Sequence, residues 1–482
     1  MLKISLWALG AAAVAAGCTF QPEYGRPVAP VAQSWPGSVG PATTASTSPA
    51  TNAAAIGWRD FFTDPRLQKL IELSLANNRD YRVAMLNVQD LEAQYRLQRA
   101  ALLPNISGYV ANNRSRVPGN TSGFTTAYTA NQYSLSLGMA SYEIDFFGRI
   151  RSLKASALER YFATAETRRT AQIALVSAVA NQYLATLEYE EALVVARQTL
   201  ETVQKSYDLN KRSFELGKIS ELDVRTAEAQ VQRSRSDAAA FSQLLATAQN
   251  ALTVLVGQPL PADLPPVRPL AAQGILAEVP VGLPSEVLQQ RPDVLSAEHQ
   301  LKAANANIGA ARAAFFPSIT LTGSIGTSSS ELSGLFGPGT AAWNFSPQIK
   351  VPLFEVASNR ATLDSAEVRK KVQVANYEKA IQTAFREVAD TLAGKGNLTE
   401  QLAAQQSLVE AQAGRFKLAD LRYRNGIDSY LTVLLAQTDL TAAQQSLLQA
   451  RLAVLANEIS LYKALGGGWV ERTGEPVTVD AK

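Results

Sequence analysis

The sequence of 482 residues contains one cysteine, Cys18, and one histidine, His299. A single cysteine excludes an intramolecular disulfide. No second imidazole or thiol lies near His299 in the sequence, so we expect a solvated or packed helix residue there and not a metal ligand. The sequence also lacks a glycine-rich phosphate loop, a metal-spaced cluster and a nucleophile elbow. We therefore expect no catalytic residues, no metal and no cofactor, and an enzyme is the least favoured class.

An excess of charge of one sign is also absent. The 45 basic and 42 acidic residues give a formal net charge of +3, which argues against a nucleic-acid surface and a polybasic membrane patch. After residue 17 no run approaches about 18 consecutive apolar residues, so no transmembrane helix is predicted. Hydrophobic residues still make up 46% of the chain, which is ample for a large core.

The first 17 residues have the order of a secretory signal peptide. Lys3 carries a positive charge, residues 4–16 carry none, and the run ends in small residues. Residues 15–18, AAGC, resemble the lipobox of bacterial lipoproteins, in which the thiol is lipidated and the chain is cut just before it. The resemblance implies lipid attachment at Cys18, whereas a packed apolar residue is the more usual role of a lone cysteine.

The chain contains two internal repeats. Residues 80–106 align without gaps on residues 293–319, and residues 214–227 align on residues 423–436. Two matching blocks in the same order predict two copies of one structural plan. The predicted division is a lipidated extended linker at 18–57, a first repeat at 58–257, an inter-repeat segment at 258–290, a second repeat at 291–466 and a loosely held polar tail at 467–482.

Each predicted repeat has the order helix, strand, strand, long helix, returning helix. A proline ends the first helical segment, at 79–102 and at 291–315. Alternation of apolar and polar residues then predicts strands. They are expected at about 105–115 and 132–145 in the first repeat, and at about 318–327 and 342–353 in the second.

The long helices follow from the absence of helix breakers. From Arg149 to Leu216 there is no proline and no glycine, and such a helix would be about 100 Å long. Gly217 and Gly426 follow as C-terminal breakers, and apolar heptads continue into a returning helix. We predict helical hairpins at about 149–256 and 357–465. A cytosolic coiled-coil scaffold would explain these helices but not the signal peptide or the strands.

Four strands of about ten residues are near the 9–11 that cross a membrane when tilted. A sheet in lipid must close on itself, and bacterial barrels use roughly eight or more strands. The strands therefore form a small soluble sheet on the helices, or several chains share one barrel.

Over nearly its whole length the chain resembles the TolC-like outer-membrane efflux channels, in the lipoprotein branch that serves RND multidrug pumps. The resemblance is carried by five motifs: PEYGRP at 22–27, WRDFFTDP at 58–65, SYEIDFFGR at 141–149, RPD at 291–293, and residues 423–437. It implies a mainly α fold with a membrane β-barrel. Three chains would form a 12-stranded barrel in the outer membrane and a 12-helix barrel in the periplasm. Around it would run an equatorial belt built from linkers and segments near 257–290 and 394–400.

The resemblance also implies the function. Drugs and other small toxic compounds would pass without covalent chemistry from an inner-membrane RND-type pump and a periplasmic adaptor to the exterior. The alternatives are a conduit for secreted polypeptides, which shares the fold, and a structural coiled-coil envelope lipoprotein. No nucleic acid is expected as a partner.

In that family the hairpin tips meet the adaptor and close the tunnel. The implied adaptor contacts in this chain are Gly217, Lys218, Ser220, Arg422, Gly426 and Ser429. Related channels often carry aspartates at the positions of Thr432 and Leu435, the candidate gate, but this chain has neither acid. Leu435 would then form an apolar constriction that gates by dewetting, or would pack between helices.

Overall fold

The computed structural model describes residues 19–32, 34–35, 53–118, 126–276, 280 and 288–474. The predicted signal peptide and Cys18 lie outside these residues. The chain forms two compact units. Unit 1 draws on residues 1–28, 87–165 and 296–378, and unit 2 on residues 29–86, 166–295 and 379–482. Each unit therefore takes residues from both sequence repeats.

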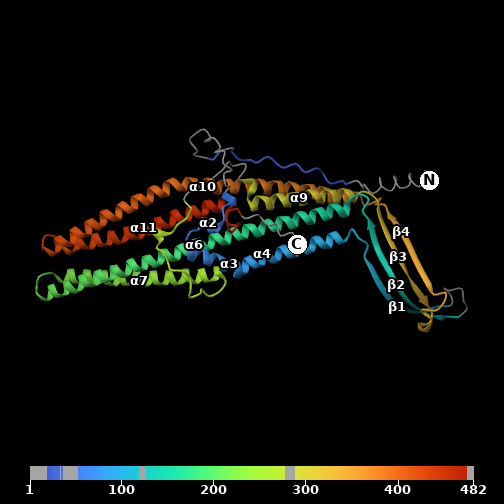
Figure 1. Ribbon diagram of the computed structural model, residues 1–482, viewed down its shortest axis with the longest axis horizontal. Helices are drawn as coiled ribbons and strands as arrows, with labels where there is room; N and C mark the ends of the chain where they lie inside the picture. Colours follow the sequence, from blue (N-terminus) through green and yellow to red (C-terminus); the bar gives the residue numbers. More distant parts are fainter. Residues whose placement is uncertain are drawn as a thin grey trace. The chain divides into compact units, whose positions relative to one another are not determined.

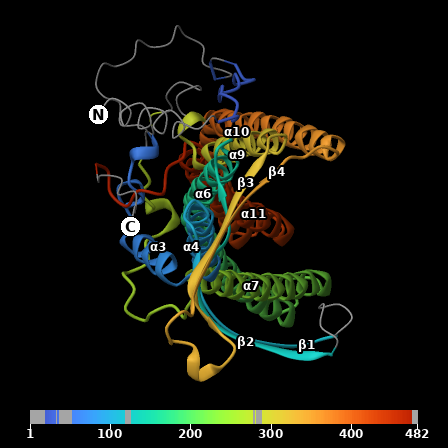
Figure 2. The same cartoon turned by 90° about the vertical axis from the view of Figure 1, so that its right-hand side faces the viewer.

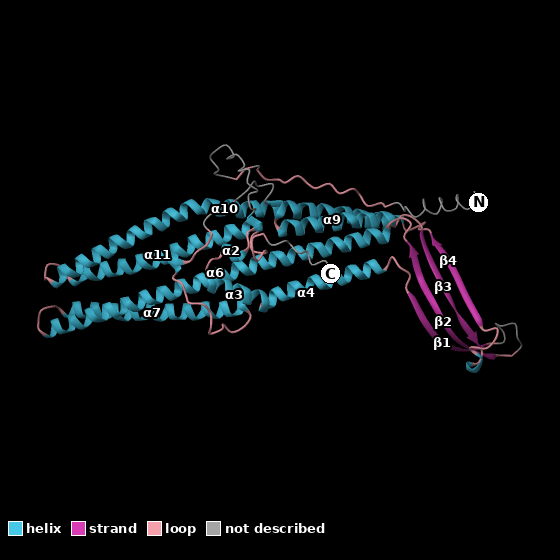
Figure 3. Cartoon of the chain, in the orientation of Figure 1, coloured by secondary structure: helices cyan, strands magenta, loops and turns pink. Residues whose placement is uncertain are grey.

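The two repeats contain the same elements in the same order (Figure 1). The first has α4 (Arg79–Ala100), β1 (Ile106–Val117), β2 (Tyr128–Ile144), α6 (Arg149–Glu215) and α7 (Glu221–Val256). The second has α9 (Pro292–Ala313), β3 (Ser318–Ser329), β4 (Ala341–Lys350), α10 (Val356–Arg424) and α11 (Tyr430–Ala464). Shorter elements are η1 (Ala53–Ala55), α2 (Trp58–Phe61), α3 (Pro65–Asn77), η2 (Leu270–Ala272) and η3 (Leu332–Gly334). Helices predominate and one small sheet is present, so the predicted mainly α class is confirmed (Figure 3).

Two strands differ from the predicted bounds by three or more residues at one end. β2 begins at Tyr128, four residues before the predicted start, because its polar first residues pair with residues 114–117 of β1. β4 ends at Lys350, three residues before the predicted end. Pro352 follows shortly and has no N–H to donate to a ladder.

Unit 1 contains one antiparallel sheet of four strands in the order β1-β2-β3-β4. The sheet is curved, as the view turned by 90° shows (Figure 2). The β2–β3 register shifts between Met139 and Tyr142, where Ser141 has a positive φ of 50°. Such a bulge increases the local bend of a strand, and here it lies near the helical end of the sheet.

The N-terminal segment of unit 1 is fixed along α9. Arg26 donates two hydrogen bonds to Glu298, of 3.0 and 2.8 Å, and Tyr24 donates a third of 3.1 Å. The Glu298 side chain is only 4% exposed, so its buried charge is paired with Arg26, whose side chain is 44% exposed. Phe20 stacks on Phe316 with ring centroids 4.5 Å apart. Tyr24 and Arg26 of the PEYGRP motif therefore hold the N-terminal segment against α9.

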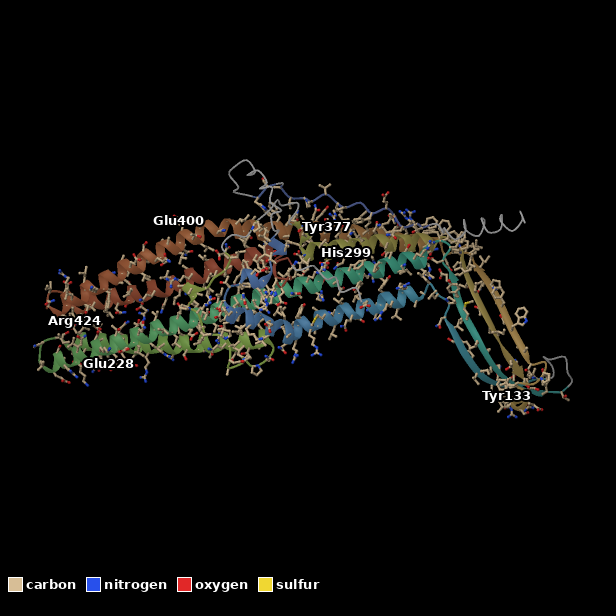
Figure 4. All side chains as sticks on the ribbon, viewed as in Figure 1. Tyr133, Glu228, His299, Tyr377, Glu400 and Arg424 are labelled. Atoms are coloured by element: carbon tan, nitrogen blue, oxygen red, sulfur yellow. The ribbon has the colours of Figure 1, made fainter. Side chains whose placement is uncertain are left out.

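His299 is a helix residue of α9, as the sequence indicates. Its Nδ1 lies 2.6 Å from Glu159 Oε2 on α6, and its side chain is partly buried (Figure 4).

The WRDFFTDP motif forms the centre of the unit 2 core. Trp58, Phe61 and Phe62 are buried, and Phe61 stacks on Tyr462 with centroids 3.9 Å apart. Asp64 caps α3 by accepting from the Arg66 amide, and it also accepts a 2.9 Å hydrogen bond from Tyr183. These residues are structural because they join α2 and α3 to the long helices α6 and α11.

Arg291 of the RPD motif joins three elements within unit 2. Its guanidinium donates to Asp293 at 2.6 Å, to Glu387 of α10 at 2.7 Å and to the Ala464 carbonyl of α11 at 2.6 Å. The side chain is 8% exposed, and each partner carries negative or partial negative charge. A buried charge with such partners fixes the geometry of the elements that supply them.

The predicted loose tail is wrong for residues 467–474. The amides of Trp58 and Arg59 donate to the carbonyls of Val470 and Glu471, at 3.0 and 3.1 Å. Gly467 packs on the ring of Tyr462, where a Cβ would lie only 2.1 Å from a ring carbon. The glycines that suggested a flexible end instead allow the backbone to approach the aromatic core.

By length and composition, α7 could cross a membrane, with a mean hydropathy of 1.3 over its most apolar 18 residues. The sequence prediction required an unbroken apolar run, which α7 lacks. The mean hydropathy is nevertheless high because α7 contains many alanines. The inner side of α7 is packed: Leu252 and Val256 enter the unit 2 core, and Gln182 of α6 donates to the Ala248 carbonyl at 3.0 Å. We therefore assign α7 to a helical hairpin with α6.

Candidate membrane sheet and helical tips

One face of the sheet is apolar across all four strands. The register places Leu137 opposite Ile325, and Ile325 opposite Trp343. Because side chains alternate along a strand, the same face carries Ile106, Val110, Leu135, Met139, Ile319, Leu321, Phe345 and Ile349. Many of these side chains are exposed in the single chain, including Val110 at 81% and Trp343 at 78%. An exposed apolar face of this extent requires an apolar surrounding.

The other face of the sheet is polar. Apart from Tyr109, Val117 and Tyr128, it carries small or hydrophilic side chains: Ser134, Ser136, Gly138, Thr320, Thr322, Ser324, Asn344, Ser346 and Gln348. The rows of the apolar face from Ile319 to Thr327 span about 26 Å along β3, or about 20 Å along the barrel axis at a tilt near 40°, which fits within the roughly 25 Å apolar band of outer-membrane barrels. One face thus suits lipid and the other suits water.

Both outer edges of the sheet are unpaired within the part of the chain that the structure describes. β1 and β4 therefore present rows of free N–H and C=O groups. In lipid each unsatisfied group costs several kcal/mol, on the order of 2–7, so these edges need strands from another chain.

The two hairpins of unit 2 end in turns of the same type. At the first, Lys218 N donates to Ser213 O and Gly217 N to Phe214 O; at the second, Ile427 N donates to Arg422 O and Gly426 N to Tyr423 O. This is the Schellman pattern. It requires a left-handed residue, and φ is +68° at Gly217 and +72° at Gly426.

The predicted contact residues all lie at these turns, and the two turns lie at the same end of unit 2 (Figure 1). Ser220 caps α7 through a reciprocal pair of hydrogen bonds with Asp223, whereas Ser429 at the start of α11 forms no side-chain cap. Arg422 donates two hydrogen bonds to Asp428, of 2.6 and 3.0 Å, and these lower the pKa of the Asp428 carboxyl. Lys218 is exposed.

The tips also expose large apolar side chains that sequence reasoning did not select. Leu216 and Leu222 are 70% and 75% exposed, and Ile427 and Leu431 are 62% and 56% exposed. Four such residues close to two turns form an exposed apolar surface of the kind that is typical of protein contacts. Their position next to the breaker glycines is the sequence feature that would have found them.

Behind the tips a groove of about 360 Å³ separates the hairpins. α6 and α10 are joined there by a 2.6 Å hydrogen bond from Tyr423 to Asn210 Oδ1. Asn210 is fully buried, and its Nδ2 has no partner among the described residues. Burial raises the pKa of Tyr430, one of the lining residues, to about 12. The groove is lined by Thr202, Lys205, Ser206, Leu209, Phe416, Asp420, Tyr423, Arg424, Tyr430 and Val433.

A profile of the outer membrane efflux protein family matches residues 70–258 and 283–467, which together cover most of both repeats. The chain belongs to the outer membrane efflux protein family.

Individual relatives agree over nearly the full length. The chain is 50% identical over 460 residues to the probable efflux pump outer membrane protein TtgC of Pseudomonas putida, covering 95% of this chain and 94% of TtgC. It is 42% identical to the cation efflux system protein CusC of Escherichia coli, covering 94% and 96%. Among solved structures, the open-state outer membrane channel MtrE of Neisseria gonorrhoeae is similar with a TM-score of 0.85 and 39% identity, covering 95% of this chain and all of that one.

These findings confirm the predicted family, the efflux role and the outer-membrane location of this efflux protein. They do not test individual tip residues, so the adaptor contacts and the gate stay predictions. For the gate, the structure places Leu435 on the surface, half exposed, between buried Val433 and Ala436. Packing within the chain therefore does not account for Leu435, and Thr432 beside it is partly exposed.

Within unit 1 of the efflux protein, a second groove of about 1050 Å³ lies along α6, α9 and α10. Its lining is mainly alanine, serine, threonine and glutamine, with Arg149, Arg160 and Arg369.

Proposed function

We propose that three copies of this chain form a passive export channel in the outer membrane. The observation that carries the proposal is the sheet of unit 1, with one apolar face and two unpaired edges. Two chains would supply eight strands, whose interior is filled by side chains. Three chains supply twelve strands and are the smallest assembly that leaves an open passage, with the Ser- and Thr-rich face toward water.

The helices support the same assembly. Two hairpins in each chain give twelve helices in a trimer, and α6 alone, with 67 residues, is about 100 Å long. Helices of that length exceed a hydrocarbon layer of about 30 Å, so they belong in the periplasm. Apolar side chains that are exposed in the single chain then find partners in neighbouring copies: Leu97 of α4, Val194 of α6, and Val368, Val372, Leu418 and Leu421 of α10.

The cargo is a set of small toxic compounds. Relatives named as outer membrane proteins of toluene, solvent and antibiotic efflux pumps, and as a protein of a cation efflux system, support this class over secreted polypeptides. Transport needs no covalent chemistry and no cofactor in this chain, which acts as a channel and not as an enzyme. Energy comes from an inner-membrane RND-type pump through a periplasmic adaptor.

The adaptor binds the tips. The exposed side chains of Leu216, Leu222, Ile427 and Leu431 supply an apolar contact, and the predicted polar contacts lie among them. The groove between α6 and α10 extends this surface. Inside the tunnel, Leu435 from each copy forms the apolar constriction, with Thr432 one turn away.

The assembly is tested by native mass spectrometry and single-channel recording of the full-length protein in mild detergent and lipid bilayers. We expect trimers, and conductance only from trimers, because a single sheet cannot close. A stable monomer that conducts ions would contradict the proposal. Deletion of the gene should sensitise cells to dyes, detergents and antibiotics, whereas unchanged sensitivity would argue for a structural envelope protein.

We also propose a lipid anchor on Cys18. Cys18→Ser should abolish incorporation of radiolabelled palmitate, because serine cannot form the thioether. Most drug resistance should remain, since the barrel holds the protein in the membrane. Ser34→Ala, in the linker beyond the signal peptide and lipobox, serves as a control that should still be labelled. Unchanged labelling of the serine variant would exclude lipidation at this position.

A further inference from the structure

The apolar face of β1 changes character toward the β1–β2 loop. Val110 is the last apolar residue on this face, and Asn112, Arg114 and Arg116 continue it. On β2 the same face carries Tyr133 opposite Asn112, Asn131 opposite Arg114, and Thr129 opposite Arg116. Two arginines thus stand next to each other immediately beyond the band that contacts hydrocarbon.

Neither guanidinium has a carboxylate partner among the described residues. Both side chains are exposed. The sequence from Ala101 to Tyr142 contains no aspartate or glutamate, so residues 119–125 supply no carboxylate either. The one carboxylate between β3 and β4 is Glu331. The loop end of the first hairpin therefore carries two positive charges that the chain itself does not neutralise.

The height of these arginines on the sheet defines what they meet. At about 3.3 Å per residue, Arg114 lies roughly 13 Å along the strand beyond Val110, and a tilt near 40° reduces this to about 10 Å. That distance leads from the hydrocarbon edge into the headgroup layer. Tyr133, one row below Arg114, occupies the level where aromatic girdles lie in such barrels (Figure 4).

We propose that Arg114 and Arg116 bind the phosphate groups of a lipid in the outer leaflet. A guanidinium matches phosphate through two parallel N–H donors, and this pairing is stronger than a neutral hydrogen bond. Side chains two residues apart on one strand lie about 7 Å from each other, so the pair can hold two phosphates of one headgroup or clamp one. Asn131 and Thr129 add neutral donors on the same face.

The inference rests on the proposed barrel, because the loop end of the sheet faces outward only if the helices lie in the periplasm. The lipid occupies the outer wall of the barrel and not its lumen. Binding and conduction are therefore separable, and each can fail without the other.

The test compares the wild-type trimer with lipid A, a bis-phosphorylated glucosamine lipid, and with the same lipid after removal of its phosphates. Native mass spectrometry should show about tenfold better retention of the phosphorylated form, on the scale expected for two basic residues at a charged surface. Equal retention of the two lipids would overturn the inference, and this comparison needs no variant. Displacement of the lipid by millimolar inorganic phosphate would identify a site for the free ion and would also overturn it.

Three variants locate the contact. R114Q/R116Q should lose the preference for phosphorylated lipid, R114K/R116K should keep part of it, and Glu331→Gln should leave it unchanged. Single-channel conductance should match wild type in all three, because the arginines lie outside the lumen. A phosphate preference that survives in R114Q/R116Q would refute the assignment to these residues. Wild-type protein that binds the lipid but never conducts would instead refute the channel proposal.

Discussion

Phe345→Arg is expected to abolish insertion of the protein into the outer membrane. Phe345 lies in the middle row of the apolar face, opposite Gly323, and is 60% exposed in the single chain. An arginine on the lipid face at the bilayer midplane costs about 2–4 kcal/mol, and a trimer contains three copies. The total of roughly 6–12 kcal/mol is comparable to the whole stability of a folded domain, about 5–15 kcal/mol.

The matched control is Ser346→Arg, one residue further along β4. Ser346 lies opposite Thr322 on the polar face, so its arginine would point into water. We expect this variant to assemble normally, with altered ion selectivity. Membrane fractionation and trimer formation on non-denaturing gels measure both variants. If Phe345→Arg assembled as well as Ser346→Arg, the assignment of the two faces would be wrong.

Gly426→Val is expected to abolish efflux while leaving the trimer intact. Gly426 has φ +72°, a conformation that costs a β-branched residue about 1–3 kcal/mol. There is open space around its position, with no atom within 4 Å of an added Cβ, so the effect is on the backbone and not on packing. The strained turn should shift Ile427 and the Arg422–Asp428 pair, and with them the surface that the adaptor contacts.

Two substitutions separate backbone strain from side-chain size. Gly426→Asn should retain most resistance, because asparagine adopts the left-handed conformation at lower cost. Gly414→Val places the same side chain in open space inside α10 and should have little effect. The readouts are drug susceptibility, trimer yield in the outer membrane and crosslinking to the adaptor. Full resistance in Gly426→Val cells would show that this turn does not engage the pump.

The repeat was predictable because the two copies share matching residues that can be aligned in the sequence. Equivalent helices α4 and α9 begin 213 residues apart, and the tip glycines 209 residues apart, as the two aligned blocks indicate. Breaker residues likewise located the ends of the long helices. Such local features need no knowledge of the partner elements.

The two faces of the sheet were only partly predictable. Alternation along each strand separated its apolar and polar sides, but the pairing of Leu137 with Ile325 and of Ile325 with Trp343 depends on register. Arg114 and Arg116 could be assigned to the apolar face of the whole sheet only from that register. The hydrogen bond between Tyr423 and Asn210 could likewise not be predicted from the sequence, because the two residues lie on separate helices far apart in the chain.

The tail shows how composition misleads. Three consecutive glycines predicted a flexible end, but a glycine also fits where a backbone must touch a ring, as Gly467 does at Tyr462. The following Trp469 and Val470 are apolar, and they are the sequence signal of burial that the prediction did not use.

The contact between the tail and α2 has a consequence for the order in which the protein matures. Trp58 and Arg59 are held by Val470 and Glu471, more than 400 residues later, so the core of unit 2 is complete only after nearly the whole chain has been delivered. Pairings this distant in sequence form slowly. Until then the apolar strands and helices remain uncovered and dependent on chaperones. A chain truncated before residue 469 should therefore be degraded during biogenesis, so that only finished copies reach the membrane.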